Sequence, residues 1–148
     1  MVEENIEAFL SNAKEHLETA EIILRSNKYF DVVFHSIMSI ENSTSAIILK
    51  LGALPSKRHS NHLILHHLLP EVKVEWRGEY EKVISFAAEL LPQISLTRYP
   101  FIKGDKILIP SQYYSREDGE KALEKARFVY SFAEKLMEKP NAIADNQT

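Results

Sequence analysis

The sequence of 148 residues contains no cysteine, only four glycines and only six prolines. Without cysteine the chain can form no disulfide and can use no thiol chemistry. Four scattered glycines cannot build the glycine-rich loops that bind phosphates in Walker A or dinucleotide-binding motifs. Glycine and proline are also the main punctuation of turns, so their scarcity predicts long elements joined by few turns.

The chain also has no excess of basic charge. The chain has 18 Lys and Arg against 21 Asp and Glu, a net charge of −3, so it has no global basic field for nucleic acid, and such contact would need a local basic patch. The first residues are acidic where a secretory signal would be basic, and no apolar run approaches the length of a membrane-spanning helix. We therefore expect a cytoplasmic protein without membrane contact.

Helical periodicity covers most of the chain. Apolar residues recur at steps of three and four, which is typical of amphipathic helices. The stretch 31–51 is apolar on most of its circumference, and such a helix is usually buried by several neighbours. We therefore expect the rest of the chain to pack around it. The other predicted helices cover 3–26, 61–69, 71–94 and the segment between Ser115 and Pro140.

Two of these helices carry boundary signals. A proline in a helix interior costs about 3 kcal/mol, so Pro92 predicts that the long helix kinks or ends near Leu90. Ser115 followed by Asp118 resembles a capping box, which favours the start of the last helix there.

These elements predict an all-α fold. Four long amphipathic stretches with short links form an antiparallel up-and-down bundle, to which 61–69 adds one short helix. The segment before the last helix is an irregular loop or a small hairpin around Gly104-Asp105. We predict one domain over 1–140 and a disordered polar tail over 141–148.

Glu41 stands in the middle of the apolar helix. A buried carboxylate needs a partner, and His62, Arg98 or Tyr99 could supply one. Elsewhere, pairs of acidic residues stand at helix starts, where the helix dipole stabilises their negative charge.

The histidines gather around the short helix. His59, His62 and His66 step by three and four, so they would share one face of a helix that starts early enough. An i, i+4 pair can bind zinc, but a third ligand would have to come from elsewhere, such as Glu71 or Glu41. Histidines that cap, hydrogen-bond or face solvent are the alternative, and we predict no metal site and no cofactor.

Basic residues occur in two separate places. Lys57, Arg58 and His59 precede the short helix, whereas Arg98, Lys103 and Lys106 lie in the irregular segment. If that segment folds over the helix, these groups form one patch. With Tyr99, Tyr113 and Tyr114 nearby, the patch could hold phosphates and stack a base. The alternative is a set of solvated loop charges.

A pattern spread over about 8–138 resembles a known family. Its features are a central helix with a glutamate and a late lysine (Glu41, Lys50), a histidine opening a leucine-rich helix (His62), and an Arg-Tyr-Pro segment after a long helix. In this order and spacing the chain resembles the HEPN domain, the "higher eukaryotes and prokaryotes nucleotide-binding" family. The resemblance implies a helical bundle that is commonly a homodimer, often a toxin–antitoxin partner of a small nucleotidyltransferase.

Many HEPN proteins are also metal-independent endoribonucleases, whose motif is arginine, four to six residues, then histidine. From Arg58, the histidines that follow leave zero, three, seven and eight intervening residues, so none has that spacing. An active ribonuclease would have to use Arg58 and His62 one turn apart, where an i, i+4 pair shares a face. Whether the chain is an enzyme therefore stays open.

Three hypotheses follow from the resemblance. The first is a homodimeric interaction module with a nucleotidyltransferase partner and a cleft that faces nucleotide or RNA. Its site residues are Glu41, His62, Arg98 and Tyr99: Arg98 would bind phosphate, Tyr99 would stack or hydrogen-bond, and His62 with Glu41 would fix the arginine or a ligand. The second is an endoribonuclease using Arg58 and His62 with Arg98. The third is a non-catalytic dimeric scaffold in which Arg-Tyr-Pro only fastens the loop to the bundle.

Overall fold

The computed structural model describes residues 2–138, and every structural statement below concerns them. The chain forms six α-helices, three 3-10 helices and one hairpin, in this order: α1 (Val2–Ile23), η1 (Leu24–Ser26), α2 (Tyr29–Lys50), α3 (Asn61–His67), η2 (Leu69–Glu71), α4 (Val74–Leu90), η3 (Leu91–Thr97), β1 (Phe101–Lys103), β2 (Lys106–Leu108), α5 (Pro110–Tyr113) and α6 (Arg116–Glu138). The predicted all-α bundle is confirmed. The tail over 141–148 and the stop at Pro140 lie outside the described residues.

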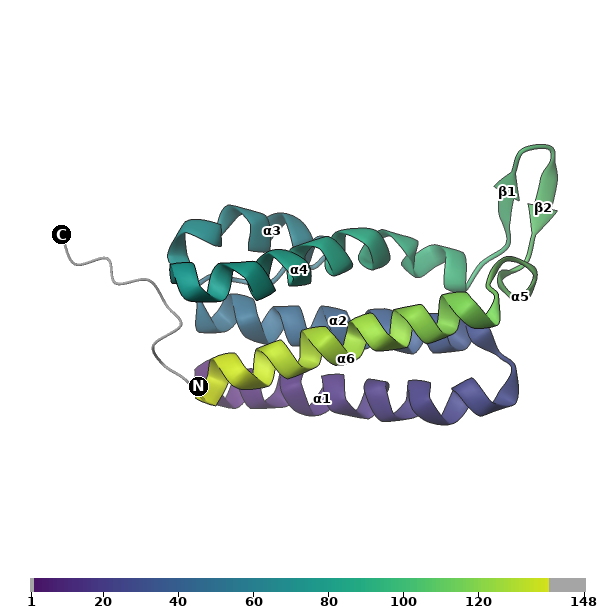
Figure 1. Cartoon of the computed structure of the whole chain (residues 1–148). Helices are drawn as coiled ribbons and strands as arrows, with labels where there is room; N and C mark the ends of the chain where they lie inside the picture. The colour runs from purple at the N-terminus through teal and green to yellow at the C-terminus, as the bar shows by residue number, and fades with distance from the viewer. Residues whose placement is uncertain (1, 139–148) are drawn as a thin grey trace.

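Helix α2 is the centre of the bundle (Figure 1). It packs antiparallel to α1, contacts α6 along its length, and is covered elsewhere by α3, α4 and η3. Thirteen of its 22 residues are buried, including small polar ones. The expectation that the chain packs around this helix is therefore correct, because its sequence leaves few side chains that prefer water.

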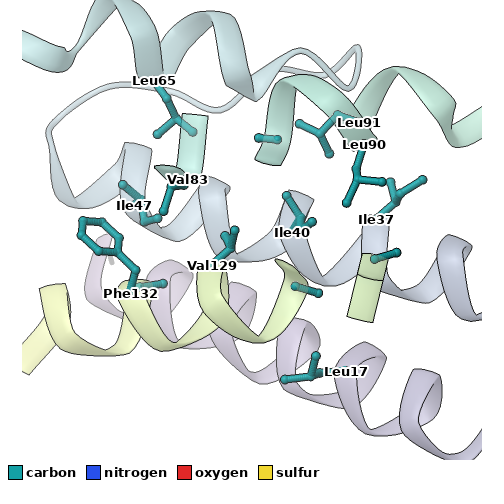
Figure 2. Close-up of a cluster of buried hydrophobic side chains, with 14 of the residues drawn as sticks. Leu17, Ile37, Ile40, Ile47, Leu65, Val83, Leu90, Leu91, Val129 and Phe132 are labelled. Atoms are coloured by element: carbon teal, nitrogen blue, oxygen red, sulfur yellow. The ribbon is translucent and has the colours of Figure 1, made fainter. Parts of the chain in front are cut away.

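The core joins every long helix (Figure 2). Ile37, Ile40 and Ile47 of α2 are fully buried between Val83 and Leu90 of α4 on one side and α6 on the other. Each apolar side chain of this size contributes roughly 1.5–3 kcal/mol when fully buried. Burial at these positions therefore outweighs any single helix cap, which is worth about 1 kcal/mol.

The boundary signals in the sequence are borne out. Helix α4 ends at Leu90, and Pro92 lies in the first turn of η3. Before α6, the Ser115 amide donates to the Asp118 carboxylate at 2.8 Å, and the Asp118 amide donates to the Ser115 hydroxyl at 3.2 Å. This reciprocal pair is a capping box.

The segment before α6 is the hairpin rather than an irregular loop. Strands β1 and β2 pair antiparallel, with Phe101 opposite Leu108 and Ile102 opposite Ile107. Gly104 in the turn has φ +65°, a conformation that suits glycine. The hairpin leaves the bundle as a projecting arm at the end where α2 begins (Figure 1).

One sequence expectation needs correction. By length and composition alone, Tyr29–Lys50 is apolar enough to cross a membrane, although no such run was expected. In the fold, 72% of its most apolar window is buried inside the bundle. The apolar character of α2 is thus accounted for by its place in the core.

Candidate functional site

One face of α2 is only partly covered by its neighbours. Between 31 and 49, every residue of α2 that is not buried falls on this face, because the steps between them are those of a single helical stripe. We call this set the α2 stripe: Asp31, Phe34, His35, Met38, Glu41 and Leu49. A side chain here can meet a ligand or a second protein without opening the core.

A groove runs along the C-terminal half of the α2 stripe. It encloses about 530 Å³ between α1, α2 and the loop that follows α2. Its floor holds Met38 and Asn42, and the Asn12 amide of α1 donates to the Asn42 side-chain oxygen at 3.1 Å. Phe9 and Pro55 form apolar walls. The groove therefore combines apolar surface with a few fixed amide groups.

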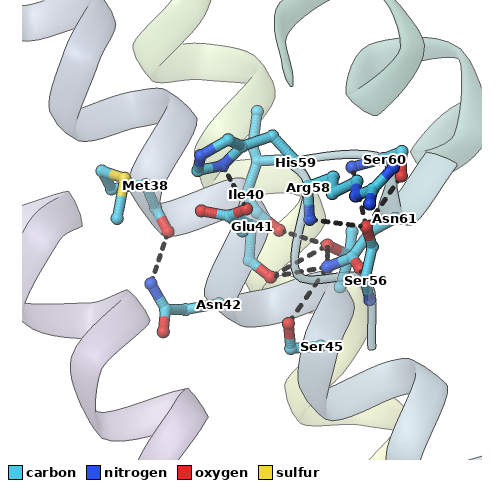
Figure 3. Close-up of polar contacts among 11 residues, drawn as sticks. Met38, Ile40, Glu41, Asn42, Ser45, Ser56, Arg58, His59, Ser60 and Asn61 are labelled. Atoms are coloured by element: carbon cyan, nitrogen blue, oxygen red, sulfur yellow. Dashed lines mark hydrogen bonds and ion pairs between the residues drawn. The ribbon is translucent and has the colours of Figure 1, made fainter. Parts of the chain in front are cut away.

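Glu41 meets His59, which is not among the partners predicted for it. The His59 Nδ1 lies 2.5 Å from the Glu41 carboxylate (Figure 3). Only 16% of the Glu41 side chain is exposed, whereas the imidazole is 45% exposed. His62, Arg98 and Tyr99 were the partners predicted for Glu41; the loop before α3 instead puts His59 closer, with φ +58° at that residue.

Asn61 holds that loop against α2 (Figure 3). Its buried amide donates to the Glu41 carbonyl, to Thr44 and to Ser45, and its side-chain oxygen accepts the Ser56 backbone amide at 2.8 Å. A buried amide with all these partners is well satisfied. The His59 position therefore depends on an anchor two residues along the chain.

Arg98 forms a second cluster at the start of the α2 stripe. Its guanidinium lies 2.9 Å from the Asp31 carboxylate and 3.3 Å above the Phe34 ring. The flat guanidinium suits both contacts, since it can stack on a ring while pairing with a carboxylate. Tyr99 beside it is 66% exposed and is free to meet a ligand.

Arg98 was expected to lie against the turn that carries His62. It lies instead against Asp31, at the start of α2. Asp31 and Glu41 are about 15 Å apart along α2 at 1.5 Å per residue. The physical reason is η3, which continues the chain past Leu90 to the first turns of α2 instead of letting it fold back. Within one protomer, Arg98 and Tyr99 therefore lie at the start of the α2 stripe, whereas Glu41 lies in its middle and His62 lies on α3.

His62 is half-buried in the first turn of α3. Its Nδ1 is enclosed and has no hydrogen-bond partner among residues 2–138, and burial lowers the pKa of its imidazole. Arg58 precedes α3, which starts only at Asn61. The helical spacing by which Arg58 and His62 were expected to share a face therefore does not apply.

The two groups of basic residues remain apart. Lys57, Arg58 and His59 line the loop beside the middle of α2, whereas Lys103 stacks on Tyr113 at 4.7 Å on the projecting hairpin. The single patch considered from the sequence is thus not formed within one protomer. Within residues 2–138, no three side chains of the metal-binding types lie close enough together to hold one ion.

A histidine pair joins α1 to the α2 stripe. The Nδ1 atoms of His16 and His35 lie 2.8 Å apart, so one imidazole must donate to the other. Burial lowers the pKa of both rings; for His35 the Asp31 carboxylate opposes this effect, and His16 and Arg98 add to it. The His35 Nε2 is 3.8 Å from Asp31, which links the pair to the Arg98 cluster.

Sequence analysis missed this pair, although a signal for it exists. In a helical hairpin, residues at nearly equal distances from the turn face each other. His16 and His35 satisfy this rule around the turn at 24–28, as do the Asn12–Asn42 pair and the bond from Ser39 to the Ala13 carbonyl. The register of α1 on α2 could thus have been derived from turn length.

We predict that the histidine pair makes stability depend on pH. Both folded-state pKa values are below the usual 6.5, so the unfolded state binds more protons in acid. The stabilisation is complete above pH 6.5 and is lost as the pH falls through the folded-state pKa. Urea unfolding should give a lower free energy at about pH 5.5 than at about pH 7.5, with a smaller difference in His16→Gln.

The exposed His66 supplies the control for this measurement. The variant His66→Gln should keep the full pH dependence of the natural protein, since it removes a histidine outside the pair. Equal pH dependence in His16→Gln and in the natural protein would contradict the assignment.

Comparisons with known proteins agree with this structure. The family model described as the HEPN domain matches residues 6–136. The protein named "Putative toxin MJ1304" from Methanocaldococcus jannaschii is 28% identical over 123 residues, which cover 82% of this chain and 80% of that protein. The crystal structure of TT1696 from Thermus thermophilus shares the fold, with a TM-score of 0.60 and 20% identity over 88% of this chain and 96% of that one. The resemblance read from the sequence is therefore confirmed, and the chain belongs to the HEPN family.

Proposed function

We propose that this HEPN domain is a toxin-like interaction module that dimerises through the α2 stripe. The dimer acts with a small nucleotidyltransferase and holds nucleotide or RNA in the cleft between protomers. The family match and the name of the relative support the toxin-like module. The single observation that carries the rest is the α2 stripe itself, a partly exposed face on an otherwise buried central helix.

The middle of the stripe suits a second copy of the chain. Met38, Phe9 and Leu49 give the groove apolar surface, and Asn12 with Asn42 adds polar groups that can pair across a symmetry axis. A two-fold interface uses the same patch on both protomers, so residues close to the axis meet their own copies. The axis would pass near Met38, at the centre of the stripe.

Such a symmetry combines clusters that lie apart in one protomer. The stripe is bordered by α1 on one side and by η3 and the 53–60 loop on the other. A two-fold axis perpendicular to the stripe places each end of one stripe over the opposite end of the other, and each side over the opposite side. The Glu41–His59 pair of one protomer then faces the His16–His35 pair of the other. The two copies of Arg98 stand at opposite ends of the cleft, each beside the Asp31 of its own protomer.

The chemistry of that cleft suits a nucleotide. Arg98 can exchange its Asp31 carboxylate for a phosphate, since a guanidinium binds either group through paired N–H bonds. The exposed Tyr99 ring can stack on a base. Lys57 and Arg58 add exposed positive charge beside the groove. The proposal of a nucleotidyltransferase partner rests on membership of the HEPN family.

If the protein dimerises as proposed, its molar mass in solution should depend on protein concentration. Met38→Lys places two like charges at the axis, where an unpaired buried charge is strongly unfavourable. Light scattering after size-exclusion chromatography should give a dimer for the natural protein and a monomer for Met38→Lys. Ile22→Lys changes an isoleucine that is 69% exposed on α1 and should stay dimeric. A monomeric natural protein at high concentration would refute the dimer.

The ligand role of Arg98 predicts a binding defect without unfolding. Calorimetry with ATP and with single-stranded RNA should show at least about tenfold weaker binding in Arg98→Ala, because a charge-assisted pair with phosphate is lost. Arg127→Ala removes an exposed arginine that pairs with Glu21 and is the matched control. A large loss of stability in Arg98→Ala with unchanged binding would instead favour the scaffold, in which Arg-Tyr-Pro only fastens the loop.

Endoribonuclease activity is the second candidate function. The Glu41–His59 pair favours it, because a carboxylate that orients an imidazole is a common arrangement for proton transfer. Cleavage of RNA by the purified protein in EDTA tests this activity. If it occurs, Arg58→Ala, His59→Ala and His62→Ala separate the loop pair from the half-buried His62, and an unchanged rate in all three would exclude these residues.

A further inference from the structure

The hairpin projects from the bundle with one face unused. Ile102 and Ile107 stand opposite each other in the register and are 77% and 72% exposed. Successive side chains of a strand point to opposite faces, so this pair shares one face and Phe101 with Leu108 shares the other. These two large apolar side chains form a small exposed apolar patch on the projecting arm.

The opposite face of the hairpin fixes its base. The Phe101 ring packs edge-to-face on Tyr113 of α5 at 5.1 Å, and Tyr113 packs in the same manner on the buried Tyr114 at 4.9 Å. A two-stranded hairpin is at best marginally stable on its own. The aromatic contacts hold the arm in place, and they leave the isoleucine face open.

Charge at the tip of the arm is positive and has a counterpart elsewhere on the chain. Lys103 and Lys106 flank the turn, with Asp105 between them. The first turn of α1 carries Glu3 and Glu4, and Asn5 of the same turn lines the groove beside the α2 stripe. Within one protomer, the arm lies at the end of the bundle opposite the start of α1 (Figure 1).

We propose that the arm docks on the first turns of α1 in a second copy of the chain. This inference rests on the proposed dimer. The arm lies at one end of the α2 stripe, on the η3 side. Because the two-fold axis exchanges both the ends and the sides of the stripe, the arm meets the α1 side of the second copy at the other end of that copy's stripe. The positively charged tip then approaches the glutamates of the second copy, and Ile102 and Ile107 are covered near Asn5.

The absence of cysteine makes this contact directly testable by crosslinking. The variant Asn5→Cys/Ile107→Cys, with the only two thiols in its chain, should form covalent dimers on mild oxidation or with a short bismaleimide. Mixing the single variants Asn5→Cys and Ile107→Cys should give crosslinked heterodimers, which requires the contact to lie between protomers. Ile22→Cys/Ile107→Cys is the control and should give no covalent dimer, since Ile22 lies near the other end of α1.

Two further measurements separate failure of the arm from failure of the dimer. Met38→Cys should crosslink to its own copy if the proposed axis is correct. Crosslinking through Met38→Cys without crosslinking between positions 5 and 107 would overturn the arm contact and leave the dimer standing. A monomer that crosslinks at neither place would overturn both. In Ile102→Ser/Ile107→Ser, the dimer dissociation constant should rise by about tenfold or more, because buried apolar area is lost.

Discussion

The burial of α2 is the constraint on which the rest of this structure depends. A 22-residue helix that is apolar on most sides must be covered on most sides, and α1, α3, α4 and α6 do so. Along the α2 stripe this cover is incomplete. The proposed functional surface is therefore the part of α2 that remains accessible when the core is complete.

Polar groups along this stripe are organised as pairs between elements. Asp31 forms an ion pair with Arg98 at the end of η3. His35 contacts His16 of α1, and Glu41 contacts His59 of the loop after α2. Each pair also joins a neighbouring element to the central helix. Because the side chains involved are only half-buried, their contribution to stability is moderate, and they can exchange partners with a ligand or a second protomer at small cost.

The hairpin and the loop after α2 are the two short segments that carry distinctive exposed groups on the bundle. Both are short segments fixed at the base, the first by stacked aromatic rings and the second by the buried Asn61 amide. Each presents exposed groups outward, isoleucines and lysines on the arm and His59 with Arg58 on the loop. A helical bundle that shares its core with many others can acquire distinct partners through segments of this kind.

The sequence by itself determined the helices, the end of α4 at Leu90, the capping box before α6 and the family. These features depend on local spacing or on residue types whose backbone effects are short-range, so a linear pattern records them. Only the tertiary structure decided that Glu41 meets His59 and that Arg98 meets Asp31. Those partners depend on how far η3 extends and how the loop before α3 turns, and a helical period carries no information about either. The division of the predicted site between the start and the middle of α2 follows from these two connections.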